Sequence, residues 1–321
     1  MIKIGVIGAG HLGKIHIRLL KEIQEFEFVG FYDSNYENSQ KIAKKFDVES
    51  FQSAEELIEI CDAIDIVTPT KLHFAYARLV LQRGKHLFVE KPITSTLSDA
   101  KKLIKLSNGR NLKIQVGHVE RFNPAFTSIQ NDCKNPRFIE AHRLSEFNPR
   151  GTDVSVIHDL MIHDIDITLK IVSSKVKQVN ASGVSIISDT PDIANARIEF
   201  ENGCVANLTA SRISFKSMRK TRIFQKDAYI AVDFLEKKAE IIKMEDVKNI
   251  DDPFALIIDP GEGKSKKRIQ FKNPKTNENN AIRDELFAFY HAIINDTETK
   301  VTIKDAKNAL EIAEQIAKQI K

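Results

Sequence analysis

The sequence predicts an α/β protein: an N-terminal, doubly wound parallel sheet, followed by an α+β domain with an open, largely antiparallel sheet. In the first 120 residues, short and continuously apolar runs alternate with helical segments. This alternation is typical of right-handed β-α-β crossovers whose strands are buried on both faces. Farther along, apolar and polar residues alternate with a period of two, which indicates strands with one buried face. A length of 321 residues favours two domains, which we place at 1–120 and 121–321.

Each element of the first domain follows from an apolar run or a helical pattern. The expected strands are Ile2–Ile7, Phe28–Tyr32, Ala63–Val67, His86–Val89 and Lys113–Val116. The expected helices are His11–Ile23, Asn38–Phe46, Ala54–Cys61, Phe74–Gln82 and Leu97–Leu106.

In the second domain, Asn202-Gly203 is a strong hairpin signal, because both residues tolerate positive φ. Alternating strands flank it at 194–200 and 204–210. Two further strands are expected at Ala228–Phe234 and Ala239–Met244. A long loop that can hold one strand follows at Asp246–Lys275, and two helices, Arg283–Ile294 and Asp305–Ile320, close the chain.

Composition excludes several classes of protein. Apolar residues make up 42% and charged residues 29%, a balance typical of a globular chain rather than a disordered one. A formal net charge of +4 gives no indication of a nucleic-acid partner. Three distant cysteines without a CxxC pair indicate neither disulfides nor a metal site. With no secretion signal and no apolar run of about 18 residues, we expect a cytoplasmic protein without a membrane partner.

A glycine-rich loop lies between the first strand and the first helix. Gly8 permits a tight turn, Gly10 allows backbone to approach a pyrophosphate, and Gly13 allows helix and strand to pack closely. Asp33 ends the second strand 20 residues after Gly13, where an acid accepts hydrogen bonds from the adenosine ribose. The alternative is a simple turn with a surface aspartate. Because Asp33-Ser34-Asn35 contains no arginine for a 2′-phosphate, the pattern favours a Rossmann domain that binds NAD rather than NADP. His16 is expected to be a packing residue.

Glu90-Lys91-Pro92 follows the fourth strand, at the carboxyl end of the sheet where open α/β folds bind ligands. A lysine there can donate hydrogen bonds to an oxygen that gains negative charge. The alternative for a lone Lys-Pro is a surface lysine in a loop. Pro92 is a candidate for a cis peptide bond that fixes the loop.

A second polar segment lies on a helix that we place from Asp153 to Ile171. At 100° per residue, Asp159, His163 and Asp166 fall within about 60° of arc, which predicts a polar stripe on a mostly buried helix. Histidine is a natural proton acceptor near neutral pH, and a carboxylate beside it can orient it. The alternatives are a solvated polar face and, less favoured, a metal site. The candidate ligands of that site diverge around the helix: His158, Asp159, His163 and Asp164.

The chain resembles the Gfo/Idh/MocA oxidoreductases over essentially its whole length. The residues that carry the resemblance are Gly8–Gly13, Thr68-Pro69-Thr70 with His73, Glu90-Lys91-Pro92, and the spacing of Asp159, His163 and Asp166. The resemblance implies Lys91, Asp159 and His163 as the catalytic set. It also implies cofactor contacts at His11, Leu12, Thr68, Pro69, His73, Glu90 and Lys91. Val156-Ile157-His158 stands where the family usually has a Gly-Gly pair.

Within the family, residues 117–124 and 153–166 are most similar to sugar-nucleotide enzymes of the UDP-N-acetylglucosamine 3-dehydrogenase type. Arg121, Asn123 and Asp166 are candidate substrate contacts, and the first two are equally plausible as an interdomain hinge. A basic run is a candidate diphosphate contact or a solvated strand edge. Its members are Lys216, Arg219, Lys220 and Arg222.

We therefore expect NAD-dependent hydride transfer to or from a sugar hydroxyl, in particular the 3-hydroxyl of a UDP-N-acetylhexosamine. His163 would accept the proton, Lys91 would stabilise the alkoxide, and Asp159 would orient His163 or bind a neighbouring hydroxyl. The alternatives are an inositol or simple-sugar dehydrogenase and a non-catalytic regulatory protein that senses dinucleotide. The resemblance also implies a homo-oligomer, a dimer or tetramer. The exposed face of the second sheet needs either a partner or polar residues.

Overall fold

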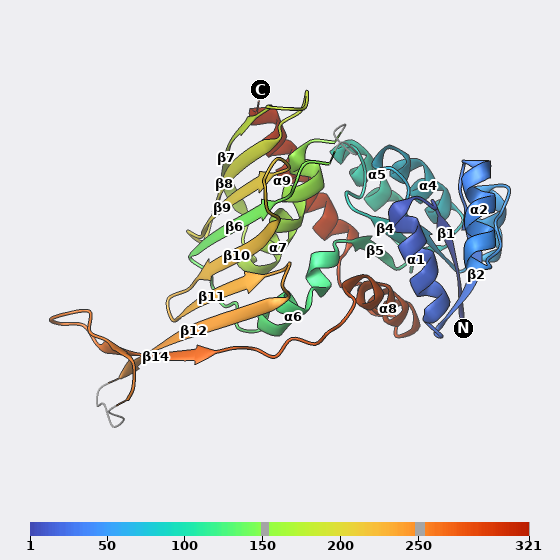
Figure 1. Cartoon of the computed structure of the whole chain (residues 1–321). Coiled ribbons are helices and arrows are strands. Elements are labelled where there is room, and N and C mark those ends of the chain that lie inside the picture. The colour runs from blue at the N-terminus through green and yellow to red at the C-terminus, as the bar shows by residue number, and fades with distance from the viewer. Residues whose placement is uncertain (149–153, 248–253, 321) are drawn as a thin grey trace. The chain divides into compact units, whose positions relative to one another are not determined.

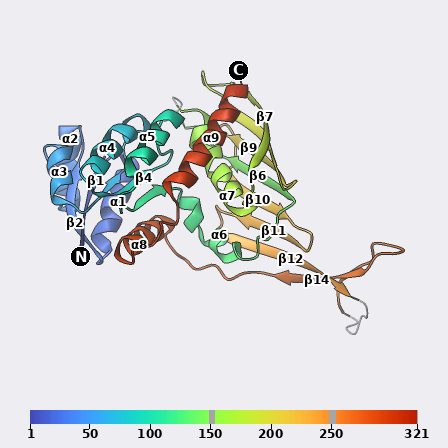
Figure 2. The ribbon, with the colours of Figure 1, turned by 180° about the vertical axis from the view of Figure 1, so that it is seen from behind.

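The computed structural model describes residues 1–148, 154–247 and 254–320. The chain divides into two compact units (Figures 1 and 2). The first unit combines Met1–Val119 with Asn280–Glu311, and the second combines Glu120–Asn279 with Ile312–Lys321. No helix in the described ranges is long and apolar enough to cross a membrane.

The first unit is built on a five-stranded sheet in the order β2-β1-β3-β4-β5, in which every neighbouring pair is parallel. This confirms the predicted doubly wound parallel sheet. In that order, the strands are Phe26–Tyr32, Ile2–Ile7, Ala63–Ile66, His86–Glu90 and Ile114–Gly117. Their continuous apolar runs reflect burial on both faces. Ile4 and Val6 belong to the apolar cluster under helix α1 (His11–Glu22), while the backbone of Gly5 faces Leu57 on the other side.

The connecting helices begin where side chains can cap them. Asn35, Ser53 and Thr96 each accept a hydrogen bond from a backbone N–H in the first turn of α2, α3 and α5 respectively. All five predicted helices are confirmed, with ends within a few residues of those expected. Helices α1 to α5 are His11–Glu22, Tyr36–Phe46, Ala54–Ile60, Thr70–Gln82 and Leu97–Ser107.

Helix α8 (Ala281–Ile294) groups with the first unit, not with the second as we expected for residues 280–311. Its Leu286 and Phe289 are fully buried in the same cluster as Ile17 and Phe88. The following segment lies along β5, where the hydroxyl of Thr299 donates to the carbonyl of Ile114 at 2.7 Å. Burial of one apolar helix face therefore draws this late segment onto the N-terminal sheet.

The second unit contains a nine-stranded sheet in the order β13-β14-β12-β11-β10-β6-β9-β8-β7. All neighbouring pairs are antiparallel except β6 with β9, which confirms an open, largely antiparallel sheet. Strands β6 to β12 are Phe138–Leu144, Val176–Val184, Ile193–Phe200, Val205–Ser211, Met218–Phe224, Ala228–Asp233 and Lys238–Val247. Helices α6 (Pro124–Ile129) and α7 (Ile162–Val172) pack against the sheet, and α9 (Ile303–Gln319) begins in the first unit and ends in the second.

Part of the expected loop Asp246–Lys275 is strand. Strand β14 (Lys266–Lys272) pairs with β12 over seven residues, and the short β13 (Ile257–Ile258) pairs with β14. The sequence of β14, KKRIQFK, lacks apolar alternation because the strand buries little of either face. Residues 248–253 lie outside the described part of the chain.

Polar side chains cover the outward positions of β8 and β9. Asn195 donates to the hydroxyl of Thr209 at 2.9 Å, and Arg197 pairs with Glu199 at 3.1 Å. The inward positions between them are buried and apolar. An exposed sheet face needs either a partner that covers it or polar side chains, and this part of the sheet carries polar side chains.

Candidate functional site

The glycine loop after β1 has the geometry that the sequence predicts. Gly8 has φ of +103°, and its N–H donates to the carbonyl of Tyr32 at 2.8 Å. A Cβ on Gly13 would lie 2.1 Å from the Gly8 carbonyl oxygen, so only glycine fits there. A Cβ on Gly10 would meet nothing within 4 Å, which leaves the backbone accessible.

Helix α1 begins at His11 without a side-chain cap, because its N-cap residue is Gly10. The first N–H groups of a helix need acceptors, and the helix dipole favours an anion at this end. The accessible backbone at Gly10 and these N–H groups together fit the pyrophosphate of a dinucleotide.

Asp33 connects the loop after β2 to the glycine loop. Its Oδ2 accepts from the backbone N–H of Ala9 at 2.7 Å, and its Oδ1 accepts from the N–H of Asn35 at 2.8 Å. Each carboxylate oxygen has two acceptor positions, so the carboxylate retains capacity for ribose hydroxyls. The side chain of Asn38 also donates to the carbonyl of Ala9 at 3.2 Å.

His73 joins the loops that follow β3 and β4. Its Nδ1 lies 2.8 Å from the carbonyl oxygen of Pro92, and its Nε2 lies 2.8 Å from that of Thr68. Burial lowers the pKa of His73, so the neutral ring donates to one carbonyl at a time at pH 7. The Lys91-Pro92 peptide is cis, as expected. His73 thus fixes the position of the loop that carries Lys91.

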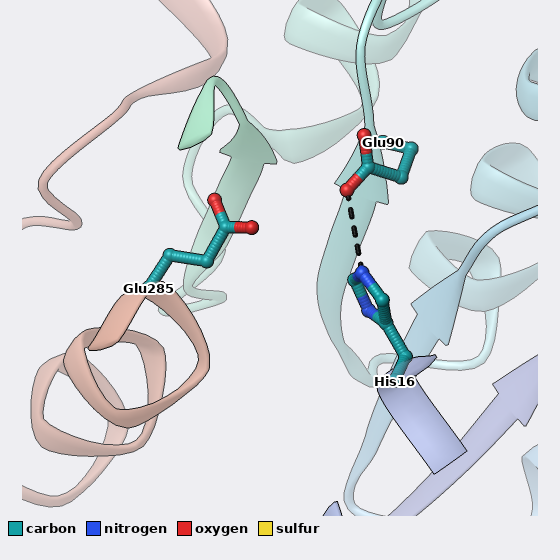
Figure 3. A group of neighbouring side chains, drawn as sticks. All are labelled: His16, Glu90 and Glu285. Atoms are coloured by element: carbon teal, nitrogen blue, oxygen red, sulfur yellow. Dashed lines mark ion pairs between the residues drawn. The ribbon is translucent and has the colours of Figure 1, made fainter. Parts of the chain in front are cut away.

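The side chains of Glu90 and His16 point toward one another, as Figure 3 shows. The Glu90 side chain, whose contact with the cofactor stays a prediction, is almost fully buried, and its Oε2 accepts from the N–H of Lys91 at 3.2 Å. His16 is completely buried and its Nδ1 lies 2.8 Å from Asp65 Oδ2. Burial alone lowers the pKa of His16, but the Asp65 carboxylate outweighs it and the pKa is raised. His16 is therefore a polar member of the core.

The helix that carries Asp159 and His163 is not one continuous α-helix. A π-helical turn over Ile157–Met161 precedes α7, and the expected start at Asp153 lies outside the described residues. A π turn changes the angular spacing, so the expected 60° arc does not hold across it. Asp159 is exposed and His163 is half-buried, while Asp166 is buried.

Asp166 belongs to a set of buried ion pairs rather than to an exposed stripe. Arg121 donates to both of its oxygens, at 2.6 and 2.7 Å. Arg143 binds Asp164 in the same bidentate manner, at 2.9 and 3.0 Å. These pairs connect the 3₁₀-helix η1 (Val119–Phe122), β6 and α7.

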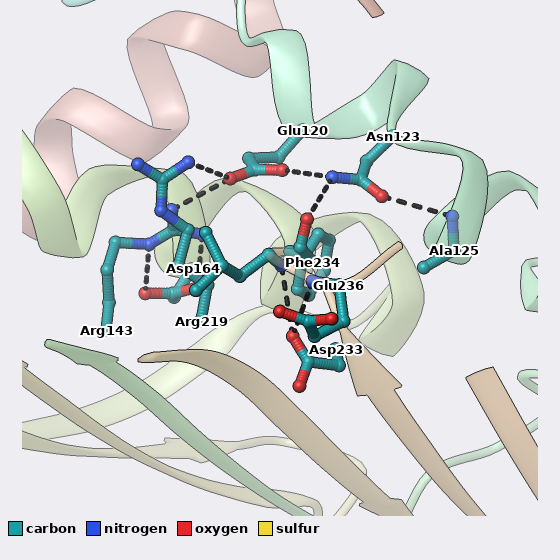
Figure 4. A network of polar contacts seen from close by, with 10 residues as sticks. Glu120, Asn123, Ala125, Arg143, Asp164, Arg219, Asp233, Phe234 and Glu236 are labelled. Atoms are coloured by element: carbon teal, nitrogen blue, oxygen red, sulfur yellow. Dashed lines mark hydrogen bonds and ion pairs between the residues drawn. The ribbon is translucent and has the colours of Figure 1, made fainter. Parts of the chain in front are cut away.

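The network around Arg143 continues to Glu120 and Asn123 (Figure 4). Arg143 donates to Glu120 at 2.8 Å, and Asn123 donates to Glu120 at 3.0 Å and to the carbonyl of Phe234 at 3.0 Å. Burial lowers the pKa of Arg143. The negative charges of Asp164 and Glu120 have the larger combined effect and raise that pKa above its usual value. The structure thus gives Arg121, Asn123 and Asp166 protein partners in the second unit.

The basic run does not form one anion-binding surface. Arg219 lies 3.7 Å from Glu120, whereas Lys220 pairs with Asp233 at 3.2 Å and Arg222 with Glu140 at 2.8 Å. Because successive side chains of a strand point to opposite faces, Arg219 and its neighbours on β10 are divided between two sides of the sheet. Each of the three already faces a carboxylate.

Sequence reasoning missed Glu285, a fully buried carboxylate on α8. It precedes the buried Phe289 by four residues and therefore lies on the apolar face of its helix. That position was the signal that could have identified it. Burial raises its pKa well above the usual value, and Glu90 and Asp65 raise it further.

The two loop glycines give a test of the dinucleotide site. We expect Gly13→Ala to lower the unfolding free energy by about 1–3 kcal/mol, because its Cβ cannot fit against Gly8. Gly10→Ala should leave stability within about 1 kcal/mol and still weaken NADH binding at least about tenfold, because the methyl group occupies the approach path of the pyrophosphate. Thermal unfolding and NADH titration measure both effects. Unchanged NADH affinity in Gly10→Ala would contradict this assignment.

Comparisons with known proteins agree with this geometry. Residues 2–118 match the family model described as "Oxidoreductase family, NAD-binding Rossmann fold", and residues 126–230 match the "GFO/IDH/MocA C-terminal domain". The UDP-N-acetylglucosamine 3-dehydrogenase of Acidithiobacillus ferrooxidans is 40% identical over 241 residues, which are 75% of this chain and 76% of that protein. Its crystal structure superimposes with a TM-score of 0.89, covering 99% of this chain and 97% of that one at 32% identity.

More distant relatives share the fold or part of the sequence. Levoglucosan dehydrogenase in complex with NADH and levoglucosan has a TM-score of 0.83 at 18% identity, covering 99% of this chain and 96% of that one. The myo-inositol 2-dehydrogenase of Thermotoga maritima is 25% identical over 229 residues, 66% of this chain and 69% of that protein. The chain belongs to the Gfo/Idh/MocA family of NAD-binding oxidoreductases.

Proposed function

We propose that the protein is an NAD-dependent dehydrogenase that transfers hydride between the nicotinamide and the 3-hydroxyl of a UDP-N-acetylhexosamine. The observation that carries this proposal is the 40% identity, over three quarters of both chains, to a UDP-N-acetylglucosamine 3-dehydrogenase. The dinucleotide loop, the fixed loop of Lys91 and the presence of Asp159 and His163 on one helical segment support it.

NAD held by the glycine loop and Asp33 would supply the hydride acceptor in the oxidative direction. The proton and the developing charge fall to side chains of this chain. His163, as a neutral imidazole, accepts the proton of the sugar hydroxyl. Lys91 donates hydrogen bonds to the alkoxide as its charge develops, which lowers the barrier because the interaction strengthens in the transition state. Asp159 orients His163 or binds a neighbouring hydroxyl. The contact between the His73 ring and the carbonyl oxygen of Pro92 holds the Lys91 loop in place.

We propose NAD as the physiological cofactor in preference to NADP. The Asp33 carboxylate is held at the end of β2 by Ala9 and Asn35, where it would repel a 2′-phosphate. Arg121, Asn123 and Asp166 remain predicted substrate contacts. Their partners within the second unit indicate a positioning role for the loop after β5 and for α7.

A simple-sugar or inositol dehydrogenase is the second candidate, favoured by the similarity to a myo-inositol 2-dehydrogenase. Nothing in the described residues favours the alternative of a sensor without catalysis. The family is one of oxidoreductases, and the catalytic residues implied by the resemblance are all present: Lys91, Asp159 and His163.

The substrate is tested with a panel of UDP-sugars, free sugars and inositols, each assayed with NAD for absorbance of NADH. We expect UDP-N-acetylhexosamines to give the highest kcat/KM. Lys91→Ala should lower kcat about 100- to 1,000-fold and His163→Ala about 100- to 10,000-fold, both with NADH affinity retained, because each removes a transition-state interaction.

Lys101→Ala, on the exposed surface of α5, is the control for loss of a lysine and should keep full activity. Turnover of inositols alone would support the second candidate. Near-normal rates in either catalytic variant would contradict the proposed roles.

The cofactor preference is tested with Asp33→Asn, which keeps an acceptor for Ala9 and removes the negative charge. We expect the wild-type protein to bind NADH more tightly than NADPH, and the variant to shift the ratio of the two dissociation constants about tenfold toward NADPH, because the repulsion of the 2′-phosphate is lost. Equal affinities for both cofactors in the wild-type protein would refute the preference.

The homo-oligomer is also a prediction. Size-exclusion chromatography with light scattering should give the mass of a dimer or tetramer of a chain of 36.4 kDa. The resemblance implies assembly through the exposed face of the second sheet. Because the outward positions of β8 and β9 on that face are polar, we expect ion pairs in the oligomer contact that weaken with salt. A monomer at micromolar concentration would contradict the prediction.

A further inference from the structure

Three buried side chains converge in the first unit from distant parts of the chain: His16 on α1, Glu90 at the end of β4 and Glu285 on α8 (Figure 3). His16 and Glu285 have no exposed surface and Glu90 is 7% exposed. One nitrogen or oxygen atom from each side chain lies within 4.8 Å of the corresponding atoms of the other two. His16 and Glu285 have no role in the hydride transfer proposed above.

Polar atoms at this place lack partners. Among the described residues, neither carboxyl oxygen of Glu285 has a hydrogen-bond partner, and His16 Nε2 has none. Glu90 Oε1 lies 3.5 Å from Nε2. A buried carboxylate without a partner costs the free energy of its desolvation, and natural proteins rarely leave one so. An occupant between these side chains would remove that cost.

The atoms that face the occupant are acceptors. Asp65 Oδ2 lies 2.8 Å from His16 Nδ1, and an ionised carboxylate only accepts, so the hydrogen is on Nδ1. A metal ion that binds there displaces any hydrogen on Nε2, and the lone pair of Nε2 then faces the ion together with Glu90 and Glu285. A histidine held through its other nitrogen by a carboxylate is the usual arrangement of a metal-binding histidine.

The spacing of His16 and Glu90 also fits an ion. Two ligand atoms about 2.1 Å from a tetrahedral ion lie about 3.4 Å apart, close to the 3.5 Å between Nε2 and Glu90 Oε1. Gly117 on β5 makes room for the Glu90 carboxylate, because a Cβ there would lie 2.5 Å from Oε1. A carboxylate is a favourable ligand for a cation, and two of the three side chains here, Glu90 and Glu285, carry carboxyl groups.

We propose that His16 Nε2, Glu90 and Glu285 bind a divalent transition-metal ion, with Asp65 as the positioning residue of His16. One imidazole and two carboxylates suit Zn²⁺ or Mn²⁺ better than Ca²⁺, which prefers oxygen ligands alone. Bound there, the ion would link α8 to α1 and β4. Its role is structural, since it fastens the late segment 280–311 to the N-terminal sheet.

The test measures metal in the full-length protein, purified without a polyhistidine tag from cells grown with added Zn²⁺ or Mn²⁺. Mass spectrometry of the metal should give about one ion per chain. After removal of the metal by chelation, titration with Zn²⁺ should raise the melting temperature of the wild-type protein, since a ligand that binds only the folded state stabilises it.

Glu285→Gln keeps the shape of the side chain and removes a ligand charge, and His16→Asn removes the nitrogen ligand. Each should lower the affinity for Zn²⁺ by more than about 100-fold, and Asp65→Asn by about 10- to 100-fold because it acts through His16. Glu298→Gln, an exposed carboxylate of the same segment, is the matched control and should bind like the wild-type protein.

The proposal is overturned if the wild-type protein holds less than about a tenth of an ion per chain and its melting temperature does not respond to Zn²⁺ or Mn²⁺. In that case the acceptors share protons or water. It is also overturned if metal binds equally well to Glu285→Gln and His16→Asn, because the ion then binds elsewhere. Neither result bears on hydride transfer, which the substrate panel tests separately.

Discussion

The parallel direction of the five strands is the constraint on which the dinucleotide site depends. Parallel strands end at the same edge of a sheet, so the loops that follow them meet there although their residues are far apart in the sequence. Gly8, Asp33, Thr68 and Lys91 each follow a different strand of this sheet. Hydrogen bonds between loops then fix the edge: Asp33 holds the glycine loop, and His73 holds the loop of Lys91.

In the second unit, buried charges organise the helix that carries Asp159 and His163. Arg121 and Arg143 each bind a carboxylate of α7 through two nitrogen atoms, and a bidentate pair fixes direction as well as distance. Such pairs contribute little net free energy compared with apolar packing, but removal of one partner leaves a buried charge and costs about 3–5 kcal/mol. Their value here is the orientation of α7 directly after the π turn.

The sequence predicted the elements that local rules determine. The glycine loop, the five strands and the hairpin at Asn202 follow from turn chemistry and apolar period, and all were found. The sequence allowed one strand within Asp246–Lys275 but did not locate β14, because its charged residues bury little surface. It did not indicate the π turn at Ile157–Met161, since the apolar pattern there fits an ordinary α-helix as well. The pair of Arg121 and Asp166 spans 45 residues, and no spacing rule connects them. The surroundings of Glu285 could not be predicted for the same reason, because His16, Asp65 and Glu90 come from three distant segments.

The return of residues 280–311 to the first sheet affects how the chain folds during synthesis. When the ribosome has produced the first 119 residues, the face of the sheet later covered by Leu286 and Phe289 is still open. It stays open while residues 120–279 are translated, at about 5–20 residues per second. For roughly ten seconds or more, the nascent chain therefore exposes an apolar surface at which a chaperone can bind.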